Sequence, residues 1–247
     1  MPATGIGPLP RGLLSRLTGP GQADPARLAA DLTVLAGGGY LKLALPSRFG
    51  GAGLGLTDLA CAQRQLAARA PASAWAVNAH HAWVGAAADA LASGDVAGPG
   101  PGWILGEAAR GRVFADFGGG QDQAMPLLGV PPGVPADVPP EWDWLALRSV
   151  DTRGPGRPAI EYGFVHRTRG DYRPVARQPR GAPGSPAATL IAGRHAWGLS
   201  LAGMTCYAVA RREFGRAVTQ AQRSGRSLDR WPRPRCGWMT CAASWTR

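Results

Sequence analysis

Apolar residues recur at every third or fourth position through most of the first half of the chain. Leu28, Leu32 and Leu35 show this helical spacing after the Asp-Pro pair 24–25, which favours a helix start because aspartate caps free N–H groups. The glycines 37–39 end this helix, since glycine tolerates the left-handed conformation common after a helix. The same kind of pattern predicts further helices over residues 57–70, 72–91, 103–109 and 195–224.

A different pattern begins in the middle of the chain. Apolar and polar residues alternate over 112–117, 142–150 and 160–166, and a period of two predicts β-strands. Residues 129–140 and 176–193 show neither period and are rich in proline, glycine or arginine, so they are predicted to be loops without a core strand. The pattern as a whole predicts a mainly α fold with a small β portion.

The stretch 39–54 combines an apolar run with a glycine-rich turn before a predicted helix. Such an arrangement also occurs in nucleotide-binding folds. Gly51 and Gly53 form a G-x-G pair, but Leu56 stands where a dinucleotide fingerprint has its third glycine, and no acidic residue follows at the required distance. The stretch also lacks the G-K-[ST] sequence of a P-loop. The turn is therefore predicted to be structural.

The sequence of this turn, P-S-R-F-G-G-A-G over Pro46–Gly53, resembles a P-x-x-(F/Y)-G-G-x-G turn of acyl-CoA dehydrogenases. In that family the turn joins the second and third helices, and the resemblance covers residues 24–129. The proline stops the preceding segment, and the glycines permit positive φ where the chain reverses. These glycines are Gly50, Gly51 and Gly53.

The resemblance implies an N-terminal helical domain, a partial middle β-domain and one long C-terminal helix. The change of pattern at residue 112 falls where the family has its β-domain boundary, and Asp171–Arg173 resembles a later strand. The expected divisions are a loose lead-in (1–23), a helical domain (24–111), a partial β-domain (112–176), an Arg/Pro/Gly linker (177–194), one helix of an incomplete bundle (195–230) and a tail unlike the family (231–247).

Several parts of the family pattern are absent. Residues 129–140 stand where the family has a Gly-x-Lys segment that contacts flavin, and residues 176–193 stand where it has a Gly-x-Arg-x-(T/S) strand. After residue 230 the resemblance stops, without the remaining helices of the C-terminal bundle. Our hypothesis is a shortened or frame-shifted relative, which alternative reading frames of the coding sequence would test.

The resemblance implies a flavin-dependent oxidoreductase that removes hydrogens from the α and β carbons of an acyl-CoA thioester, with FAD as the hydride acceptor. The missing segments predict that this activity is impaired. A glycine-rich loop after residue 116 resembles the family loop that covers the flavin, and Gln121 departs from the family pattern there. An ordinary turn between strands is the alternative interpretation. The expected FAD-binding residues are Phe117, Gly118, Gly120 and Asp122.

No catalytic base is assigned from the sequence. The family uses a glutamate, and Glu213 is the only carboxylate on the predicted helix 195–224. It lies among Arg211, Arg212 and Arg216, which is typical of a salt bridge on a solvated helix face. We therefore interpret Glu213 as a surface ion-pair partner.

No metal site is predicted either. His80 and His81 are adjacent in a predicted helix, so their side chains diverge by about 100° and are poorly placed to share a metal ion. We expect one of them to be packed and the other exposed. Cys236 and Cys241 have no second pair and no nearby histidine, which argues against zinc.

The formal net charge of +11 would ordinarily suggest nucleic acid or an anionic surface as a partner. Residues 1–129 are nearly neutral, however, and the excess lies in residues 130–247. Lys42 is the only lysine, whereas phosphate-binding proteins generally combine lysine with arginine. No specific nucleic-acid binding is expected.

No apolar run reaches eighteen residues and the four cysteines are dispersed, so we expect a cytoplasmic protein without a membrane span.

Two other functions stay open at this point. The chain could be a non-catalytic remnant or a helical interaction protein, because an incomplete bundle exposes apolar faces that favour association, including homo-oligomer formation. It could also be a basic nucleic-acid-binding protein, which a steep salt dependence of DNA binding would reveal.

Overall fold

The computed structural model describes residues 11–19, 25–94, 100–116, 142–151, 159–179 and 185–224. These residues form mostly helices, one four-stranded sheet and a long helix late in the chain. The predicted mainly α class with a small β portion is thereby confirmed. The chain divides into two units, Met1–Val209 and Ala210–Arg247.

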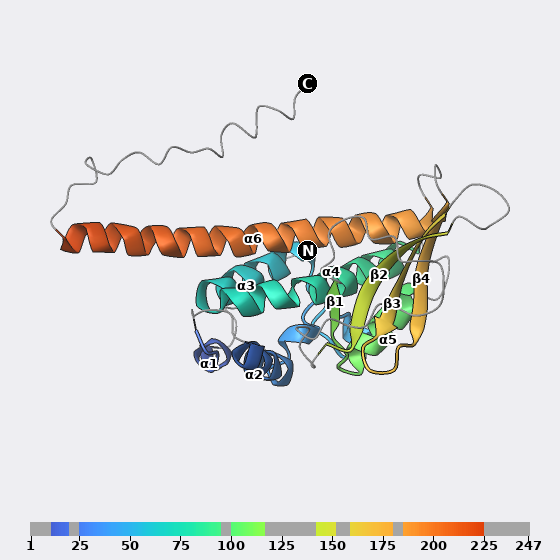
Figure 1. Ribbon diagram of the computed structural model, residues 1–247, viewed down its shortest axis with the longest axis horizontal. Helices are drawn as coiled ribbons and strands as arrows, with labels where there is room; N and C mark the ends of the chain where they lie inside the picture. The colour runs from blue at the N-terminus through green and yellow to red at the C-terminus, as the bar shows by residue number, and fades with distance from the viewer. Residues whose placement is uncertain are drawn as a thin grey trace, which may run out of the picture. The chain divides into compact units, whose positions relative to one another are not determined.

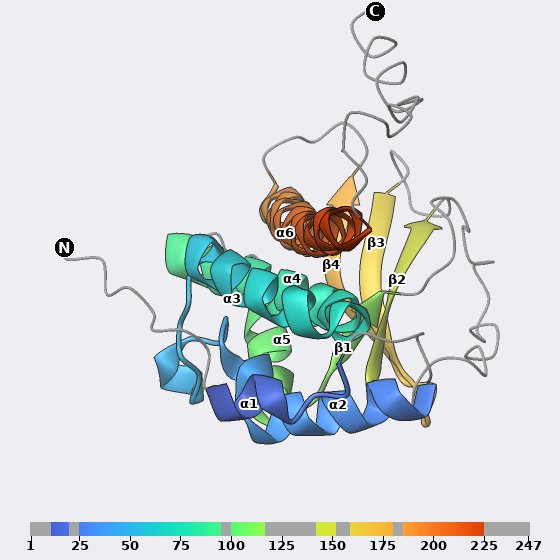
Figure 2. The ribbon, with the colours of Figure 1, turned by 90° about the vertical axis from the view of Figure 1, so that its left-hand side faces the viewer.

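Six α-helices, two short 3-10 helices and four strands make up the described structure (Figure 1). The helices are α1 (Arg11–Ser15), α2 (Pro25–Gly37), η1 (Tyr40–Lys42), η2 (Ser47–Phe49), α3 (Leu56–Arg69), α4 (Pro71–Ser93), α5 (Gly100–Ala109) and α6 (Pro186–Arg223). The strands are β1 (Phe114–Asp116), β2 (Trp144–Asp151), β3 (Ala159–His166) and β4 (Tyr172–Pro179). Within the first unit, α3 and α4 lie between α6 and the pair α1 and α2 (Figures 1 and 2).

Helix α2 and the turn after it follow the predicted pattern closely. Leu32 and Leu35 are buried, and Gly39 adopts a φ of 74° just beyond the helix. In the glycine-rich turn, Gly50 and Gly53 have positive φ as predicted. Gly51 does not, and it is needed for a different reason: a Cβ atom there would overlap the Leu45 carbonyl group.

The boundary between α3 and α4 differs from the prediction. Gly55 is the N-cap of α3, and as a glycine it has no side chain that could bond the free N–H groups of the first turn. Pro71, which lies between the two predicted helices, begins α4 at a first-turn position where its missing N–H costs nothing. Trp75 of α4 is 57% exposed, although it is a large apolar residue.

The sheet has the order β1-β2-β3-β4, with β1 parallel to β2 and the other neighbours antiparallel. The two hairpins place Trp144 opposite His166 and Val165 opposite Tyr172. Strand β4 is an edge strand and contains Pro174 and Pro179, which donate no N–H to a neighbour.

An aromatic cluster joins the helices to one face of this sheet. Trp83 of α4 and Trp103 of α5 both meet Phe164 of β3, with ring centroids 4.9 and 5.7 Å away. Trp103 also meets Trp144 of β2 at 4.8 Å. Phe114 of β1 is fully buried within the same cluster. The sheet is therefore placed by α4 and α5.

Helix α6 packs along α4 within the first unit. Trp197 lies over Gly85, where any side chain would collide with the indole ring, and its Nε1 donates to Asp89 at 2.7 Å. Asn78 donates to the Gly198 carbonyl group at 3.2 Å. The absence of a side chain at Gly85 thus sets how closely the two helices approach.

The loop predicted over residues 176–193 and the linker predicted over 177–194 are both too long. Strand β4 continues to Pro179, and α6 begins at Pro186, ahead of the predicted start at His195. Leu190 and Leu201 share the buried side of α6, so helical spacing extends into the segment despite its Arg, Pro and Gly content. Strand β4 tolerates its proline residues because it lies at the edge of the sheet.

Candidate functional site

Strand β1 ends at Asp116, directly before the loop predicted to bind FAD. The predicted FAD-binding residues Phe117, Gly118, Gly120 and Asp122 lie outside the described residues. The structure therefore gives the position from which this loop departs, at the end of β1, and the side chains that hold that position.

Asp116 is held by two helices that are distant from it in sequence. The indole N–H of Trp83 on α4 donates to Asp116 Oδ1 at 3.2 Å, and the guanidinium group of Arg194 on α6 forms an ion pair with Oδ2. The guanidinium carbon of Arg194 also lies 5.7 Å from the Trp83 ring centroid, within the range of a cation–π contact. The departure point of the loop is thus fixed where β1, α4 and α6 meet.

The ion pair is partly exposed, with side-chain exposures of 23% for Arg194 and 38% for Asp116. Such a pair contributes only about 0–1 kcal/mol to stability, so its main effect is to orient the chain. Arg194 Nε is buried without a hydrogen-bond partner among the described residues.

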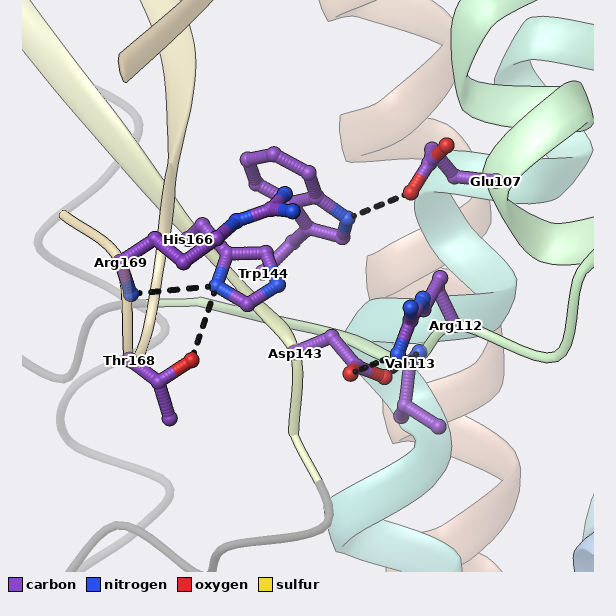
Figure 3. Close-up of polar contacts among 8 residues, drawn as sticks. All are labelled: Glu107, Arg112, Val113, Asp143, Trp144, His166, Thr168 and Arg169. Carbon is purple, nitrogen blue, oxygen red and sulfur yellow. Dashed lines mark hydrogen bonds and ion pairs between the residues drawn. The ribbon is translucent and has the colours of Figure 1, made fainter. Parts of the chain in front are cut away.

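A second group of polar contacts lies where β2 begins (Figure 3). Asp143 accepts hydrogen bonds from the Arg112 guanidinium group at 2.9 Å and from the Val113 backbone N–H at 3.1 Å. Trp144 donates its indole N–H to Glu107 of α5 at 3.0 Å, and Glu107 also pairs with Arg110. These contacts connect the segment before β1 and the end of α5 to the start of β2.

His166 forms the centre of the turn between β3 and β4. Its Nδ1 atom accepts from the Arg169 backbone N–H at 3.4 Å and lies 3.2 Å from Thr168 Oγ1, and its ring meets the edge of Trp144 (Figure 3). Burial, followed by the positive charge of Arg169, lowers the pKa of His166 and outweighs the opposing effect of Asp143. His166 is therefore a neutral residue that organises the hairpin turn.

A third polar group is buried inside the helices. Tyr40 donates its hydroxyl hydrogen to Gln63 Oε1 at 2.9 Å, and Gln63 Nε2 donates to the Ala74 carbonyl oxygen at 2.6 Å and to Thr205 Oγ1 at 3.2 Å. The edge of the Tyr40 ring meets His81 with centroids 5.2 Å apart. This network connects η1, α3, α4 and α6.

The expectation of one packed and one exposed histidine is wrong, because His80 and His81 are both buried. The two rings do point in different directions, as adjacent helical residues should. Helix α4, however, is covered on several sides, by η1, α3, β1 and α6, so both directions lead into the interior. Neither ring nitrogen of His81 has a hydrogen-bond partner among the described residues.

Other expectations have mixed outcomes. Glu213 pairs with Arg212 and Arg216 on an exposed part of α6, which confirms its interpretation as a surface ion-pair partner. Within the part of the chain that the structure describes, no group of three or more His, Cys, Asp or Glu side chains could hold a metal ion. No helix in that part is both long and apolar enough to cross a bilayer.

Sequence reasoning missed the residues that organise these polar groups. Asp116 and Arg194 are separated by much of the chain, and no periodic pattern connects them. The roles of His166 and Gln63 likewise depend on tertiary contacts. Comparison with protein-family models, curated proteins and solved structures finds no match.

Proposed function

We propose that this chain is a flavin-dependent oxidoreductase of the acyl-CoA dehydrogenase type, which acts on an acyl-CoA thioester with FAD as hydride acceptor. The observation that carries the proposal is the anchoring of Asp116 by Trp83 and Arg194, directly before the glycine-rich loop. A loop that must lie against a flat cofactor needs a fixed origin, since flexible attachment would add an entropic cost to binding.

The order of the elements supports the proposal further. Helices α2 to α5 precede the sheet and α6 follows it, which is the order implied by the resemblance of the sequence. The chain lacks several segments of the family pattern, including one that contacts flavin. We therefore propose that the enzyme is impaired. It assigns no catalytic base, because Asp116 and Glu213 are both engaged by arginine.

The surroundings of the loop are chemically compatible with a flavin. The guanidinium group of Arg194 is 23% exposed and lies beside the origin of the loop, where it would also attract an anionic group of the cofactor. FAD, when bound, would supply the hydride acceptor. The residues of the chain would orient the cofactor and exclude water from its ring.

The visible absorbance of purified protein after incubation with FAD and gel filtration tests this function. We expect close to one equivalent of bound flavin in the wild type and at least a tenfold weaker affinity in the double variant Gly118→Ala, Gly120→Ala, because added methyl groups hinder close approach of the backbone. The matched control is Gly215→Ala, at a helix position open to solvent, which should bind FAD like the wild type. Colourless wild-type protein would contradict the proposal.

A second candidate function is self-association through the outer side of α6. Leu199 is 75% exposed and Tyr207 is 50% exposed, so two large apolar side chains of one helix face solvent. Gly203 lies midway between them and is open to solvent. In an antiparallel pair of α6 helices centred on Gly203, each Leu199 would pack against the partner's Tyr207, and the glycine would allow close approach.

Light scattering during gel filtration at several protein concentrations tests this association. We expect a dimer whose dissociation constant rises at least tenfold in Leu199→Glu, because the charge would be buried in an apolar contact. Ser200→Glu is the matched control, since it adds the same charge at the neighbouring exposed position. A wild-type monomer at every concentration would exclude this candidate.

A further inference from the structure

His80 bonds two separate elements through its two ring nitrogens. Its Nε2 atom lies 2.8 Å from the Leu41 carbonyl oxygen in η1. Its Nδ1 atom accepts the backbone N–H of Phe114, the first residue of β1, at 3.4 Å. One side chain of α4 therefore links the helical segment before the glycine-rich turn to the first strand of the sheet.

The partners of His80 determine its tautomer. A carbonyl oxygen can only accept a hydrogen bond, so Nε2 must carry the hydrogen that is shared with Leu41. A backbone N–H can only donate, so Nδ1 must present a lone pair to Phe114. Both contacts can exist together only in the neutral imidazole with hydrogen on Nε2.

The bond to Phe114 also completes the edge of the sheet. Strand β1 is an edge strand and pairs only with β2 in the described sheet. An edge strand presents backbone N–H and C=O groups that lack strand partners, and a buried N–H without a partner is costly. His80 thus takes the place that an additional strand would otherwise occupy at Phe114.

Apart from the Leu41 carbonyl oxygen, the described contacts of His80 include no group that would stabilise a positive charge. Its ring is stacked with the neutral ring of Phe114 and faces the edge of His81, with centroids 5.9 and 5.4 Å away. From η1, Tyr40 faces His81. Burial lowers the pKa of His80 to about 4, against the opposing effect of the Leu41 bond, and neither cause involves a charged group of α2, α3, α5 or α6.

We propose that His80 is a proton-sensitive clasp, which joins η1 to β1 while its imidazole is neutral and releases β1 when it is protonated. Protonation places a hydrogen on Nδ1, where it faces the Phe114 N–H, and the two donors repel each other. The bond from Nε2 to Leu41 survives protonation. The release is therefore directed to the strand rather than to η1, and it does not depend on flavin binding.

Hydrogen exchange of backbone amides over a pH series tests the clasp, after correction for the intrinsic pH dependence of exchange. Between pH 6.5 and 4.5, protection of the Phe114 amide should fall at least tenfold more than protection of the Leu66 amide in α3. Nitrogen NMR of the imidazole at pH 7 should show the Nε2–H form of His80. An Nδ1–H form, or an equal loss of protection at Phe114 and Leu66, would overturn the proposal.

Two variants separate the clasp from general acid sensitivity. His80→Gln keeps a donor in reach of Leu41 but offers no acceptor in the place of Nδ1, so the Phe114 amide should exchange rapidly at pH 7 and change little on acidification. His81→Phe keeps a ring in the neighbouring position and should retain the pH-dependent release. If His80→Gln does not fold, the wild type and His81→Phe still decide the question. Loss of the pH-dependent release in His81→Phe would refute the assignment to His80.

Discussion

Replacing Phe114 with alanine is expected to lower the free energy of unfolding by about 3–5 kcal/mol. The Phe114 side chain is fully buried, and its ring lies 4.9 Å from Phe164 and 6.1 Å from Trp103. It therefore contacts β3 and α5 together, as well as His80 of α4. Truncation would leave a cavity where helices and sheet meet, and such a junction can collapse only by moving one layer against the other.

The chain offers a control for this substitution. Phe214→Ala removes the same atoms from a position that is 72% exposed, and its effect should stay within about 0.5 kcal/mol. Urea denaturation followed by circular dichroism measures both variants against the wild type. Equal losses in the two variants, or a small loss for Phe114→Ala, would show that the sheet does not depend on this junction.

Acidification from pH 7 to 4.5 is expected to remove about 2.4 kcal/mol of stability through His80 alone. Burial lowers the pKa of His80 from 6.5 to about 4 in the folded chain. As the pH falls over this range, the imidazole therefore becomes protonated in the unfolded state and stays mostly neutral in the folded state. The contribution is complete above pH 6.5 and declines as the pH falls towards 4. Burial and the charge of His80 lower the pKa of His81 as well, which adds a loss of the same sign.

Unfolding free energies from urea titrations at pH 7, 6, 5 and 4.5, at constant ionic strength, measure this dependence. The carboxylates mostly titrate below this range, which leaves the histidines as the main source of the slope. A profile that stays flat down to pH 4.5 would mean that water reaches both imidazoles in the native state, contrary to their burial in the structure.

Local patterns in the sequence predicted the existence of most elements, because helical and strand periods are properties of neighbouring residues. They could not predict which side chains of α4 are buried. Helix α4 is covered on several sides and rich in alanine, so it lacks the single polar face on which such a prediction rests. The burial of both His80 and His81 follows from this packing.

The candidate site depends even more on contacts that local sequence patterns do not predict. The glycine-rich loop after residue 116 is recognisable by its residues, and it stays a prediction. The partners that fix its origin, Trp83 and Arg194, come from two other helices and are brought together only by the packing of α6 on α4. A turn can be read from adjacent residues, whereas a contact between distant helices depends on the whole fold.

The borders of the sheet have a consequence for how the protein behaves in crowded solutions. At the β4 border, Pro174 and Pro179 have no N–H group that could bond an approaching chain. At the β1 border, the Phe114 N–H already donates to the imidazole of His80. Among the described residues, these three positions interrupt the rows of N–H donors along which a neighbouring molecule could extend the sheet at neutral pH. The proline border is permanent, whereas the imidazole border lasts only while His80 stays neutral, so acid conditions would open one direction of growth.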